Sequence, residues 1–289
     1  MATHNGSYVF IATTILPYHN LCGSKNMSKF YPNKDLAIPL GSITLVTGIS
    51  GMIAIHIVDE ALKAGFHVRG TVRSLEKGEA AVKLLDSERF EYVIVEDMAV
   101  NGAFNEAMKD VSAVIHTASI TNFSSKIEEV IPPTVKGTNE ILQAALANPS
   151  VKRVVLTSTS GAASGPRPEV KFHIGQDTWN EAALDMVRNT PSSRQAEMGF
   201  EWAYQVYVAA KIEAEKAAWD FVEKAKPPFV VNVINPSMNW GKVMGSTGVS
   251  GRQLLDVLDG NIPHIPSGMC NSTLSAILIL FNAFSFSMG

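Results

Sequence analysis

The sequence is poor in cysteine, has no excess of positive charge and contains no apolar run of the ~20 residues that a membrane span needs. Only two cysteines occur, Cys22 and Cys270, which is no disulfide framework, and no Cys/His pair has zinc-site spacing, so we expect a reducing compartment and no metal site. A formal net charge of -3 without a Lys/Arg-rich block argues against nucleic-acid binding. The expectation is a cytoplasmic protein with neither a membrane span nor a nucleic-acid partner.

Charged residues are also scarce at both ends of the chain. Residues 1–26 carry a single Asp, Glu, Lys or Arg side chain, Lys25, and lack both the basic start of a secretory signal and the arginines of a mitochondrial presequence. We expect residues 1–38 to be an N-terminal extension that is partly disordered. No such charged side chain follows Asp259, and the strongest apolar run there, residues 274–286, is shorter than a membrane span.

Residues 42–236 alternate between short β-branched runs and longer segments with helical apolar spacing. Runs such as "SITLVTG" and "KRVVLTSTS" are separated by stretches such as "AIHIVDEALKAG" and "GTNEILQAALAN". Near-continuous apolar strands separated by helices are typical of a parallel sheet that is covered on both faces. The sequence predicts an α/β fold, a Rossmann-type doubly wound parallel sheet, over residues 39–236. Such a sheet binds ligands at the carboxyl ends of its strands.

The first of these strands ends in "VTGISGMIA", a Gly-x-x-Gly-x-x-Ala turn that leads into a helix. Gly48 and Gly51 permit a tight turn and a close approach of the backbone to a pyrophosphate. The free N–H groups and the positive dipole end of the helix, which begins around Met52 and Ile53, would bind the phosphates. The plainer alternative is a turn with two glycines and no ligand.

The end of the second strand, "FHVRGTVRS", lacks the Asp or Glu that usually holds the ribose 2′-hydroxyl of NAD. It carries Arg69 and Arg73 instead, with Lys77 one helical turn further on. Because arginine binds phosphate bidentately, the sequence predicts that NADP(H) is preferred and that Arg73 and Lys77 lie at the 2′-phosphate. For Arg69, which lies within the strand, a solvated surface charge is an equal alternative.

The next strand ends carry further polar groups. Asp97 and Met98 follow the third strand, where the adenine edge of a dinucleotide would lie. The fourth strand ends in "HTAS", so Thr117, Ala118 and Ser119 would contact the dinucleotide backbone, and His116 is interpreted as a buried strand histidine. The fifth strand ends in the hydroxyl cluster "TSTSGAA".

Two tyrosines and a lysine lie close together in "EWAYQVYVAAK". Residues four apart share one face of a helix, so Tyr207 can share a site with Lys211. Tyr204 precedes Lys211 by about two turns and is expected to be a packing residue. A Tyr-x-x-x-Lys pair also arises by chance in many helices, so its spacing alone does not make it catalytic.

Taken in order, the glycine turn, "RGTVRS", "HTAS", "VVLTSTS", Tyr207-x-x-x-Lys211 and "NPSMNWG" resemble the extended short-chain dehydrogenase/reductases. More narrowly, the chain is similar to the branch that contains dihydroflavonol reductases, cinnamoyl-CoA reductases and fungal aldehyde or methylglyoxal reductases. The stretch "GQDTWNE" also resembles a segment of this branch. The resemblance covers roughly residues 27–268, and the ordered set of motifs is far more specific than any one motif.

The resemblance implies a reductase that transfers hydride from NADPH to a small aldehyde or ketone. Tyr207 would donate a proton to the carbonyl oxygen, and Lys211 would lower the pKa of Tyr207 and hold the nicotinamide ribose. Pro236 and Asn239 would position the nicotinamide ring. Thr159 stands where the family usually has the second serine of "TSS", and its hydroxyl can donate the same hydrogen bond to the substrate carbonyl.

Residues 237–289 are expected to form a small, truncated substrate lobe followed by an apolar tail. Three interpretations of the tail stay open: an aberrant chain end, an apolar helix that docks on the core, or a membrane-associating end. The alternative function is a catalytically impaired dinucleotide-binding protein, because Thr159 and the short lobe depart from the family pattern. The resemblance also implies a possible homodimer that pairs through two helices, one of which carries the tyrosine.

Overall fold

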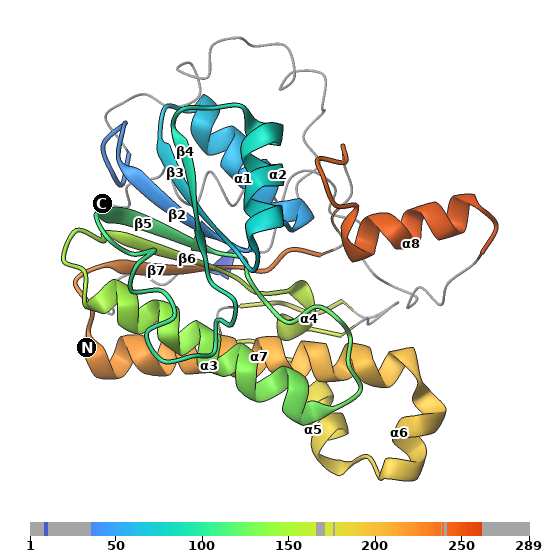
Figure 1. Cartoon of the computed structure of the whole chain (residues 1–289). Helices are drawn as coiled ribbons and strands as arrows, with labels where there is room; N and C mark the ends of the chain where they lie inside the picture. Colours follow the sequence, from blue (N-terminus) through green and yellow to red (C-terminus); the bar gives the residue numbers. More distant parts are fainter. Residues whose placement is uncertain are drawn as a thin grey trace.

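The computed structural model describes residues 9–10, 36–165, 171–175, 177–237, 239 and 242–261 (Figure 1). Most of the predicted N-terminal extension and the apolar tail after residue 261 lie outside these ranges, so the three interpretations of the tail are not tested. The predicted division into residues 1–38, 39–236 and 237–289 also stays a prediction. No helix among the described residues is long and apolar enough to cross a membrane.

The described strands form a single sheet in which every neighbouring pair is parallel. Its order is β1-β7-β6-β5-β2-β3-β4, so the order reverses between β2 and β5. Ligands of doubly wound sheets bind at such a reversal. The strands are β1 (Val9–Phe10), β2 (Ile43–Thr47), β3 (His67–Val72), β4 (Phe90–Ile94), β5 (Val111–His116), β6 (Arg153–Thr157) and β7 (Val230–Ile234).

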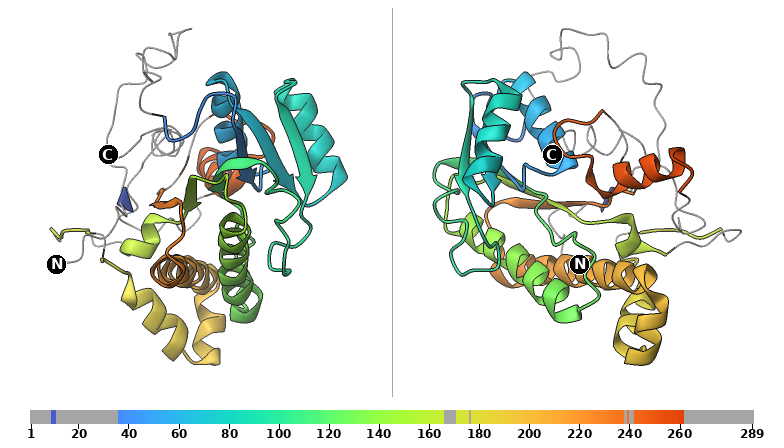
Figure 2. Two further views of the ribbon diagram at one scale, coloured as in Figure 1. Left: turned by 90° about the vertical axis from the view of Figure 1, so that its left-hand side faces the viewer. Right: turned by 45° about the vertical axis from the view of Figure 1, so that its right-hand side comes forward.

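Helices cover both faces of this sheet, as the alternating pattern of the sequence predicts (Figures 1 and 2). Helices α1 and α2 lie on one face, and α3 and α7 pack against each other on the opposite face. The predicted doubly wound α/β fold is therefore confirmed. The helices are α1 (Met52–Lys63), α2 (Leu75–Leu85), α3 (Ile127–Leu146), α4 (Ser160–Ala163), α5 (Glu181–Asn189), α6 (Ser192–Met198), α7 (Phe200–Ala225) and α8 (Gly248–Leu258).

The apolar core is divided by the sheet, because successive side chains of a strand point to opposite faces. Val46 of β2 packs with Ile57 and Val58 of α1, whereas its neighbour Leu45 packs in the cluster that contains Ile141 of α3. Each fully buried aliphatic side chain of this kind stabilises the fold by about 1.5–3 kcal/mol. The two clusters hold the strand ends in place from both sides.

A third apolar cluster lies beyond the sheet and fixes the first half of α7. Trp202 is fully buried in this cluster, and its Nε1 donates a hydrogen bond to the carbonyl oxygen of Ser125 at 2.8 Å. Ala183 and Leu184 of α5 pack in the same cluster. The helix is thereby tied both to α5 and to the loop after β5, which sets the direction in which its side chains point.

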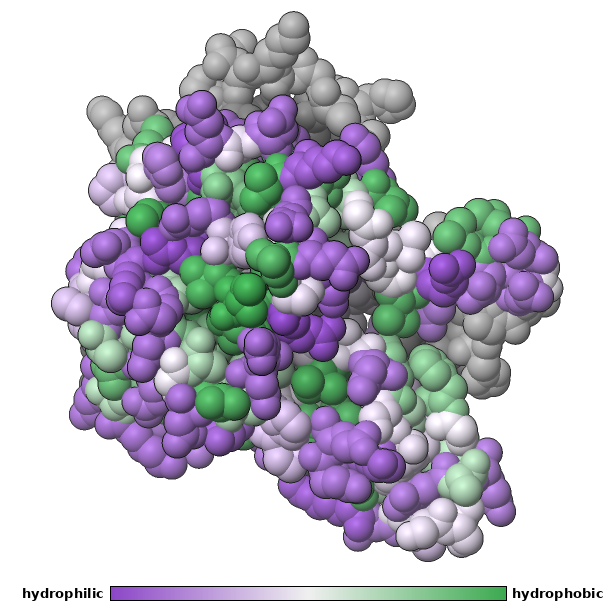
Figure 3. Space-filling view, viewed as in Figure 1, coloured by the Kyte–Doolittle hydropathy of each residue, from purple (hydrophilic) through white to green (hydrophobic). Residues whose placement is uncertain are grey.

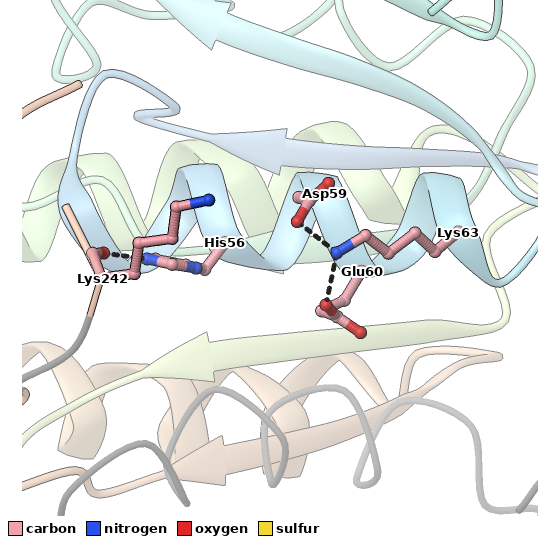
Figure 4. A network of polar contacts seen from close by, with 5 residues as sticks. All are labelled: His56, Asp59, Glu60, Lys63 and Lys242. Carbon is pink, nitrogen blue, oxygen red and sulfur yellow. Dashed lines mark hydrogen bonds and ion pairs between the residues drawn. The ribbon is translucent and has the colours of Figure 1, made fainter. Parts of the chain in front are cut away.

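The segment after β7 returns to the start of α1. The imidazole Nε2 of His56 lies 2.8 Å from the carbonyl oxygen of Lys242 (Figure 4). A Cβ at Gly248, the first residue of α8, would lie 3.2 Å from the Cβ of Met52. Helix α8 itself lies beside the sheet rather than on either face (Figure 1). The first turn of α1 is therefore flanked by a segment that is distant in the sequence.

The face drawn in Figure 1 is mostly polar; its largest apolar area lies between the two helix layers, near the edge strand β4, and smaller apolar areas are scattered over the rest (Figure 3). Ile94 at the end of β4 and Val100 in the following loop are exposed apolar side chains. Single exposed apolar residues are normal on protein surfaces.

Candidate functional site

The glycine turn and the loop after β5 pack backbone to backbone at the point where the strand order reverses. Gly48 has a φ of +70°, and a Cβ at this position would lie 3.0 Å from the Cα of Ala118. The Thr47 hydroxyl oxygen accepts hydrogen bonds from the N–H groups of Thr117 at 3.1 Å and Ala118 at 3.0 Å. Both the conformation and the close approach therefore require glycine at position 48.

The N-terminus of α1 has the features of an anion site. Gly51 is its N-cap and offers no side chain to the free N–H groups, and the first turn contains no acidic residue. The side chain of Met52 is buried and that of Ile53 is half-buried, so the backbone rather than the side chains would meet a ligand here. At Gly48 the turn leaves no room for a Cβ, and the helix that follows has free N–H groups without a side-chain cap. This arrangement fits the pyrophosphate of a dinucleotide.

The carboxyl end of β3 lies next to this turn and carries free positive charge. The Thr71 hydroxyl oxygen accepts a hydrogen bond from the N–H of Gly48 at 3.1 Å, which joins the two strand ends. Arg73 follows directly after β3 and Lys77 lies near the start of α2, and both are exposed. Within the described part of the chain, neither forms a hydrogen bond or ion pair, so both can meet a phosphate.

Arg69 has a structural role, and neither of its two sequence interpretations is correct. Its side chain is only 12% exposed and pairs with Glu91 at 2.7 Å. Its Nη1 also donates hydrogen bonds to the carbonyl oxygens of Ala107 at 3.0 Å and Lys109 at 2.5 Å. The guanidinium therefore holds the segment before β5 against the middle of β3, away from the strand's carboxyl end.

The segments that follow β4 and β5 carry polar side chains, some of which already have hydrogen-bond partners within the described ranges while others do not. The Asp97 carboxylate is exposed and accepts a hydrogen bond from the N–H of Ala99 at 2.8 Å. Met98 is half-buried against α3, where a Cβ at Gly137 would lie 2.8 Å from its Cγ. Ser119 has a buried hydroxyl without a hydrogen-bond partner among the described residues. Such a group fits a ligand contact because a buried hydroxyl left unpaired costs free energy.

Helix α7 brings its tyrosine and its lysine to the ends of β6 and β7. Lys211 is only 7% exposed, and its ammonium donates a hydrogen bond to the carbonyl oxygen of Thr157 at 2.6 Å. Thr159 is the N-cap of α4. Its hydroxyl oxygen accepts a hydrogen bond from the N–H of Gly161, with an N–O distance of 3.4 Å. The Thr159 side chain is also close enough to the Tyr207 hydroxyl to lower its pKa. Thr159 therefore lies near Tyr207, and its role toward a substrate carbonyl stays a prediction.

The pKa of Tyr207 differs from the sequence expectation. Burial raises the pKa of Tyr207 to about 12, the neighbouring Tyr204 adds to the increase, and the Thr159 side chain opposes it. Lys211 is not among the causes that shift this pKa, so the expected lowering by Lys211 is absent. Burial likewise lowers the pKa of Lys211 to about 8, against the effect of the Glu215 carboxylate.

The rings around Tyr207 form an aromatic group that includes Tyr204. Ring centroids lie 5.2 Å apart for Phe123 and Tyr207 and 6.5 Å apart for Tyr204 and Tyr207. Phe123 adopts a φ of +49°, which is unusual for a bulky side chain. Tyr204 packs as expected, but its hydroxyl also lies against α4, since a Cβ at Gly161 would be 3.3 Å from it. Phe123 belongs to "ITNFSS", residues 120–125, a segment that sequence reasoning gives as a source of pocket-lining residues without a readable chemical code for any one side chain.

His116 is the buried strand histidine that the sequence predicts. Its Nδ1 lies 2.9 Å from the Thr47 hydroxyl oxygen, which already accepts two backbone N–H groups. The Thr47 hydroxyl therefore donates its proton to Nδ1, and the neutral ring carries its own proton on Nε2. Burial lowers the pKa of His116 to about 3, with a further contribution from the Lys211 charge, so the ring is neutral at physiological pH.

The loop after β7 meets α4 at the same edge of the sheet. The buried Pro236 accepts a hydrogen bond at its carbonyl oxygen from the N–H of Ser160 at 2.8 Å. Asn239 is buried, and its amide nitrogen donates to the carbonyl oxygen of Ser237 at 2.8 Å. The Asn239 amide oxygen is buried without a partner among the described residues. This position fits one that contacts a ligand.

A separate groove of ≈ 670 Å³ runs along α3, α5 and α7. Ala209 and Glu213 line it from α7. Both are two residues from a member of the Tyr207–Lys211 pair, which places them on the other side of the helix. The groove is therefore distinct from the group of side chains around Tyr207.

Comparison with known proteins extends these observations. Residues 45–200 match the model of the 3-beta hydroxysteroid dehydrogenase/isomerase family. The chain is 39% identical over 221 residues to aldehyde reductase 2 of Sporidiobolus salmonicolor, covering 75% of this chain and 63% of that protein. It is 40% identical over 210 residues to a putative NADPH-dependent methylglyoxal reductase of Candida albicans, covering 68% of this chain and 58% of that protein.

The fold is also similar to that of a solved reductase. The crystal structure of the yeast methylglyoxal/isovaleraldehyde reductase Gre2 complexed with NADPH superposes with a TM-score of 0.60 at 30% identity, covering 70% of this chain and 59% of that chain. The chain thus spans less than two thirds of the length of each of these relatives. The chain belongs to the 3-beta hydroxysteroid dehydrogenase/isomerase family, within the extended short-chain dehydrogenase/reductases.

Proposed function

We propose that the protein is an NADPH-dependent carbonyl reductase that acts on a small aldehyde or ketone. The observation that carries this proposal is the position of Tyr207, one helical turn from Lys211 on α7 and near Thr159, the N-cap of α4. The glycine turn lies at the same edge of the sheet. The names of the relatives, an aldehyde reductase and a putative NADPH-dependent methylglyoxal reductase, support the same class of reaction.

Different residues at the carboxyl edge of the sheet would bind different parts of NADPH. The N-terminus of α1, from Gly51 onward, would bind the pyrophosphate, and Arg73 with Lys77 would bind the 2′-phosphate of NADPH. Both basic side chains are exposed and free of partners in the described part of the chain. The remaining contacts would come from Gly48, Met52, Ile53, Asp97, Met98, Thr117, Ala118, Ser119, Pro236 and Asn239.

The catalytic residues would act on the carbonyl group. When bound, NADPH supplies the hydride that the carbonyl carbon accepts. Tyr207, with its pKa raised to about 12, is protonated at neutral pH and donates its phenolic proton to the carbonyl oxygen, which completes the alcohol. The Thr159 hydroxyl would hold that oxygen by a hydrogen bond. Lys211 would hold the ribose and stabilise the phenolate that Tyr207 becomes.

The proposal is tested with the purified protein in two measurements. NADPH binding is followed by quenching of cofactor fluorescence, and turnover is followed by NADPH consumption with a panel of small aldehydes and ketones. The Tyr207→Phe variant should lose roughly a hundred- to ten-thousand-fold in kcat while the Kd for NADPH stays close to wild type. The Tyr204→Phe variant removes the neighbouring hydroxyl and is the matched control that should keep most of the activity.

The same experiment distinguishes the alternative function. NADPH binding without turnover of any carbonyl would favour a catalytically impaired dinucleotide-binding protein. The contact between the rings of Phe123 and Tyr207 favours this alternative, because Phe123 covers part of the phenol ring. Absence of NADPH binding would contradict both functions.

The predicted homodimer and cytoplasmic location stay predictions. One of the helices that would pair is α7, which carries Tyr207, and together with α3 it lines the groove of ≈ 670 Å³ described above. Val135 of α3 and Ala209 of α7 are among its apolar side chains. Light scattering of the purified protein would measure the oligomeric state directly.

A further inference from the structure

A buried carboxylate that the proposed reaction does not use lies one helical turn beyond Lys211. Glu215 is only 5% exposed, and its Oε2 has no hydrogen-bond partner among the described residues. Tyr207, Lys211 and Glu215 are spaced four residues apart on α7, so they follow one another along one face of the helix. A buried carboxylate without full hydrogen bonding costs folding free energy, so its position beside the lysine needs an explanation.

Glu215 and Lys211 line the same small cavity beneath the ends of the strands. The cavity has a volume of ≈ 10 Å³ and is also lined by His116 of β5, Thr157 of β6 and the following Ser158. The hydroxyl oxygen of Thr157 is buried without a partner in the described part of the chain, and the buried Ser158 side chain acts on the Glu215 carboxylate. The cavity is therefore polar, and charges that face it are poorly screened by solvent.

The elements around the cavity present few charges to it. Helix α7 contributes the Lys211 ammonium and the Glu215 carboxylate, and β5 contributes His116, whose ring is neutral. The remaining lining side chains are uncharged: Thr138 of α3, Leu156 and Thr157 of β6, Ser158, Ala214 of α7 and Val233 of β7. Among the residues that line this cavity, Glu215 is thus the one anion that faces Lys211.

The two groups influence each other in the expected directions. Burial lowers the pKa of Lys211, and the Glu215 carboxylate raises it. Burial raises the pKa of Glu215, and Ser158, the Lys211 charge, Trp219 and Asn235 lower it, in that order of size. A buried ammonium without a nearby anion would lose its proton at a lower pH, because desolvation would then be unopposed.

We propose that Glu215 is a positioning residue whose carboxylate keeps Lys211 protonated and so sets the upper pH limit of the reaction. The part that concerns turnover depends on the proposed reductase function. The part that concerns the charge of Lys211 does not depend on it. The two parts are therefore tested by separate measurements.

The first measurement is the titration of Lys211 by NMR with lysine labelled at Cε, in which the Lys211→Met variant assigns the signal. In the Glu215→Gln variant, Lys211 should titrate about one pH unit or more below its wild-type position. The Glu213→Gln variant removes a carboxylate from the same helix, where Glu213 pairs with Arg188 at 3.1 Å on the surface, and should leave the titration unchanged. An unchanged titration in Glu215→Gln overturns the proposal even if the protein reduces no carbonyl.

A reciprocal measurement keeps the proposal testable if Glu215→Gln does not fold. Coupling between two titrating groups is mutual, so removal of the ammonium must affect the carboxylate. In the Lys211→Met variant, the titration of Glu215, followed with glutamate labelled at Cδ, should move to higher pH than in wild type. A Glu215 titration that is the same with and without Lys211 would refute the coupling.

The second measurement is the pH profile of NADPH-dependent turnover. The decline of kcat on the alkaline side should begin about one pH unit lower in Glu215→Gln than in wild type, while kcat at the acidic end stays similar. Glu215→Asp, which keeps the charge, should restore most of the profile. A uniform loss of kcat at every pH in Glu215→Gln would indicate a purely structural role. Wild-type protein without any turnover would contradict the proposed function and leave the titration result standing.

Discussion

The two ends of the candidate cofactor site carry positive charge in opposite ways. Near α1 and β3, Arg73 and Lys77 are exposed and have no partner within the described residues. Near α7, Lys211 is buried and bonded to Thr157, with Glu215 at the same cavity. An exposed charge costs little until a ligand arrives, whereas a buried charge depends on its surroundings for its protonation state. The first end is suited to binding and the second to proton transfer.

The largest effect that would sharpen this comparison concerns stability and pH. Lys211 has a folded pKa of about 8, below the usual value of 10.5, so between these values the unfolded chain binds more protons than the native protein. Stability should therefore rise with pH in this range, by about 2 to 3 kcal/mol between about pH 8 and about pH 10. The gain is lost as pH falls through the folded pKa of Lys211.

Urea unfolding of wild type and of Lys211→Met at several pH values tests this expectation. The variant should lack the increase, because its buried side chain does not titrate. Lys224→Met, which changes an exposed lysine near the end of the same helix, should keep the increase. The raised pKa values of Tyr204 and Tyr207 act in the opposite direction above about pH 10, so the comparison stays below that value.

An intermediate effect is expected at the exposed end. Arg73→Ser should weaken NADPH binding roughly tenfold and leave NADH binding unchanged, because it removes a charge-assisted hydrogen bond to the 2′-phosphate. Unfolding free energy should stay within about 0.5 kcal/mol of wild type, as for most surface substitutions. Cofactor fluorescence titrations with NADPH and NADH measure the ratio. Equal weakening for both cofactors would remove the role assigned to Arg73.

A substitution of Arg69 should have the opposite pattern, because it should change stability and leave cofactor preference unchanged. Arg69→Met should lower the unfolding free energy by about 1–3 kcal/mol, since the carbonyl oxygens of Ala107 and Lys109 lose their donor. The ratio of NADPH to NADH affinity should not change. A change in that ratio would show that the structural assignment of Arg69 is incomplete.

The smallest effect separates backbone strain from close contact at the glycine turn. Gly41 has a φ of +80° and Gly48 a φ of +70°, but a Cβ at Gly41 meets nothing within 4 Å whereas one at Gly48 meets Ala118. Gly41→Ala should cost about 1 kcal/mol of unfolding free energy from conformation alone. Gly48→Ala should cost about 1 kcal/mol more and also weaken NADPH binding. Equal effects would mean that the loop after β5 yields to the added methyl group.

Much of the site follows from patterns that are local in sequence. The alternation of strands and helices predicts the doubly wound sheet, and strand-end positions such as Gly48 and Arg73 follow from it, because the carboxyl ends of parallel strands share one edge. The Tyr207–Lys211 spacing on one helix is local as well. The comparisons support the family and the fold, whereas the individual roles of the site residues stay proposals.

Other features depend on residues that are distant in sequence. Arg69 and Arg73 look alike in "VRGTVR", and only the position of the segment before β5 shows that Arg69 is already bonded. Glu215 continues the spacing of Tyr207 and Lys211, a signal that was present, but an acidic residue on a helix is usually a solvated surface charge. Its burial becomes evident only when the helix is packed against β5 and β6.

The sequence by itself therefore determined the sheet, the strand-end motifs and the face of α7 that carries Tyr207 and Lys211, because periodicity and turn chemistry act over a few residues. Only the tertiary structure decided which charges are buried and what they face. It showed Tyr207 with a pKa raised to about 12 where a lowered value was expected, and it placed Glu215 at the Lys211 cavity. Protonation equilibria depend on desolvation and on neighbouring charges, and both are properties of the packed chain.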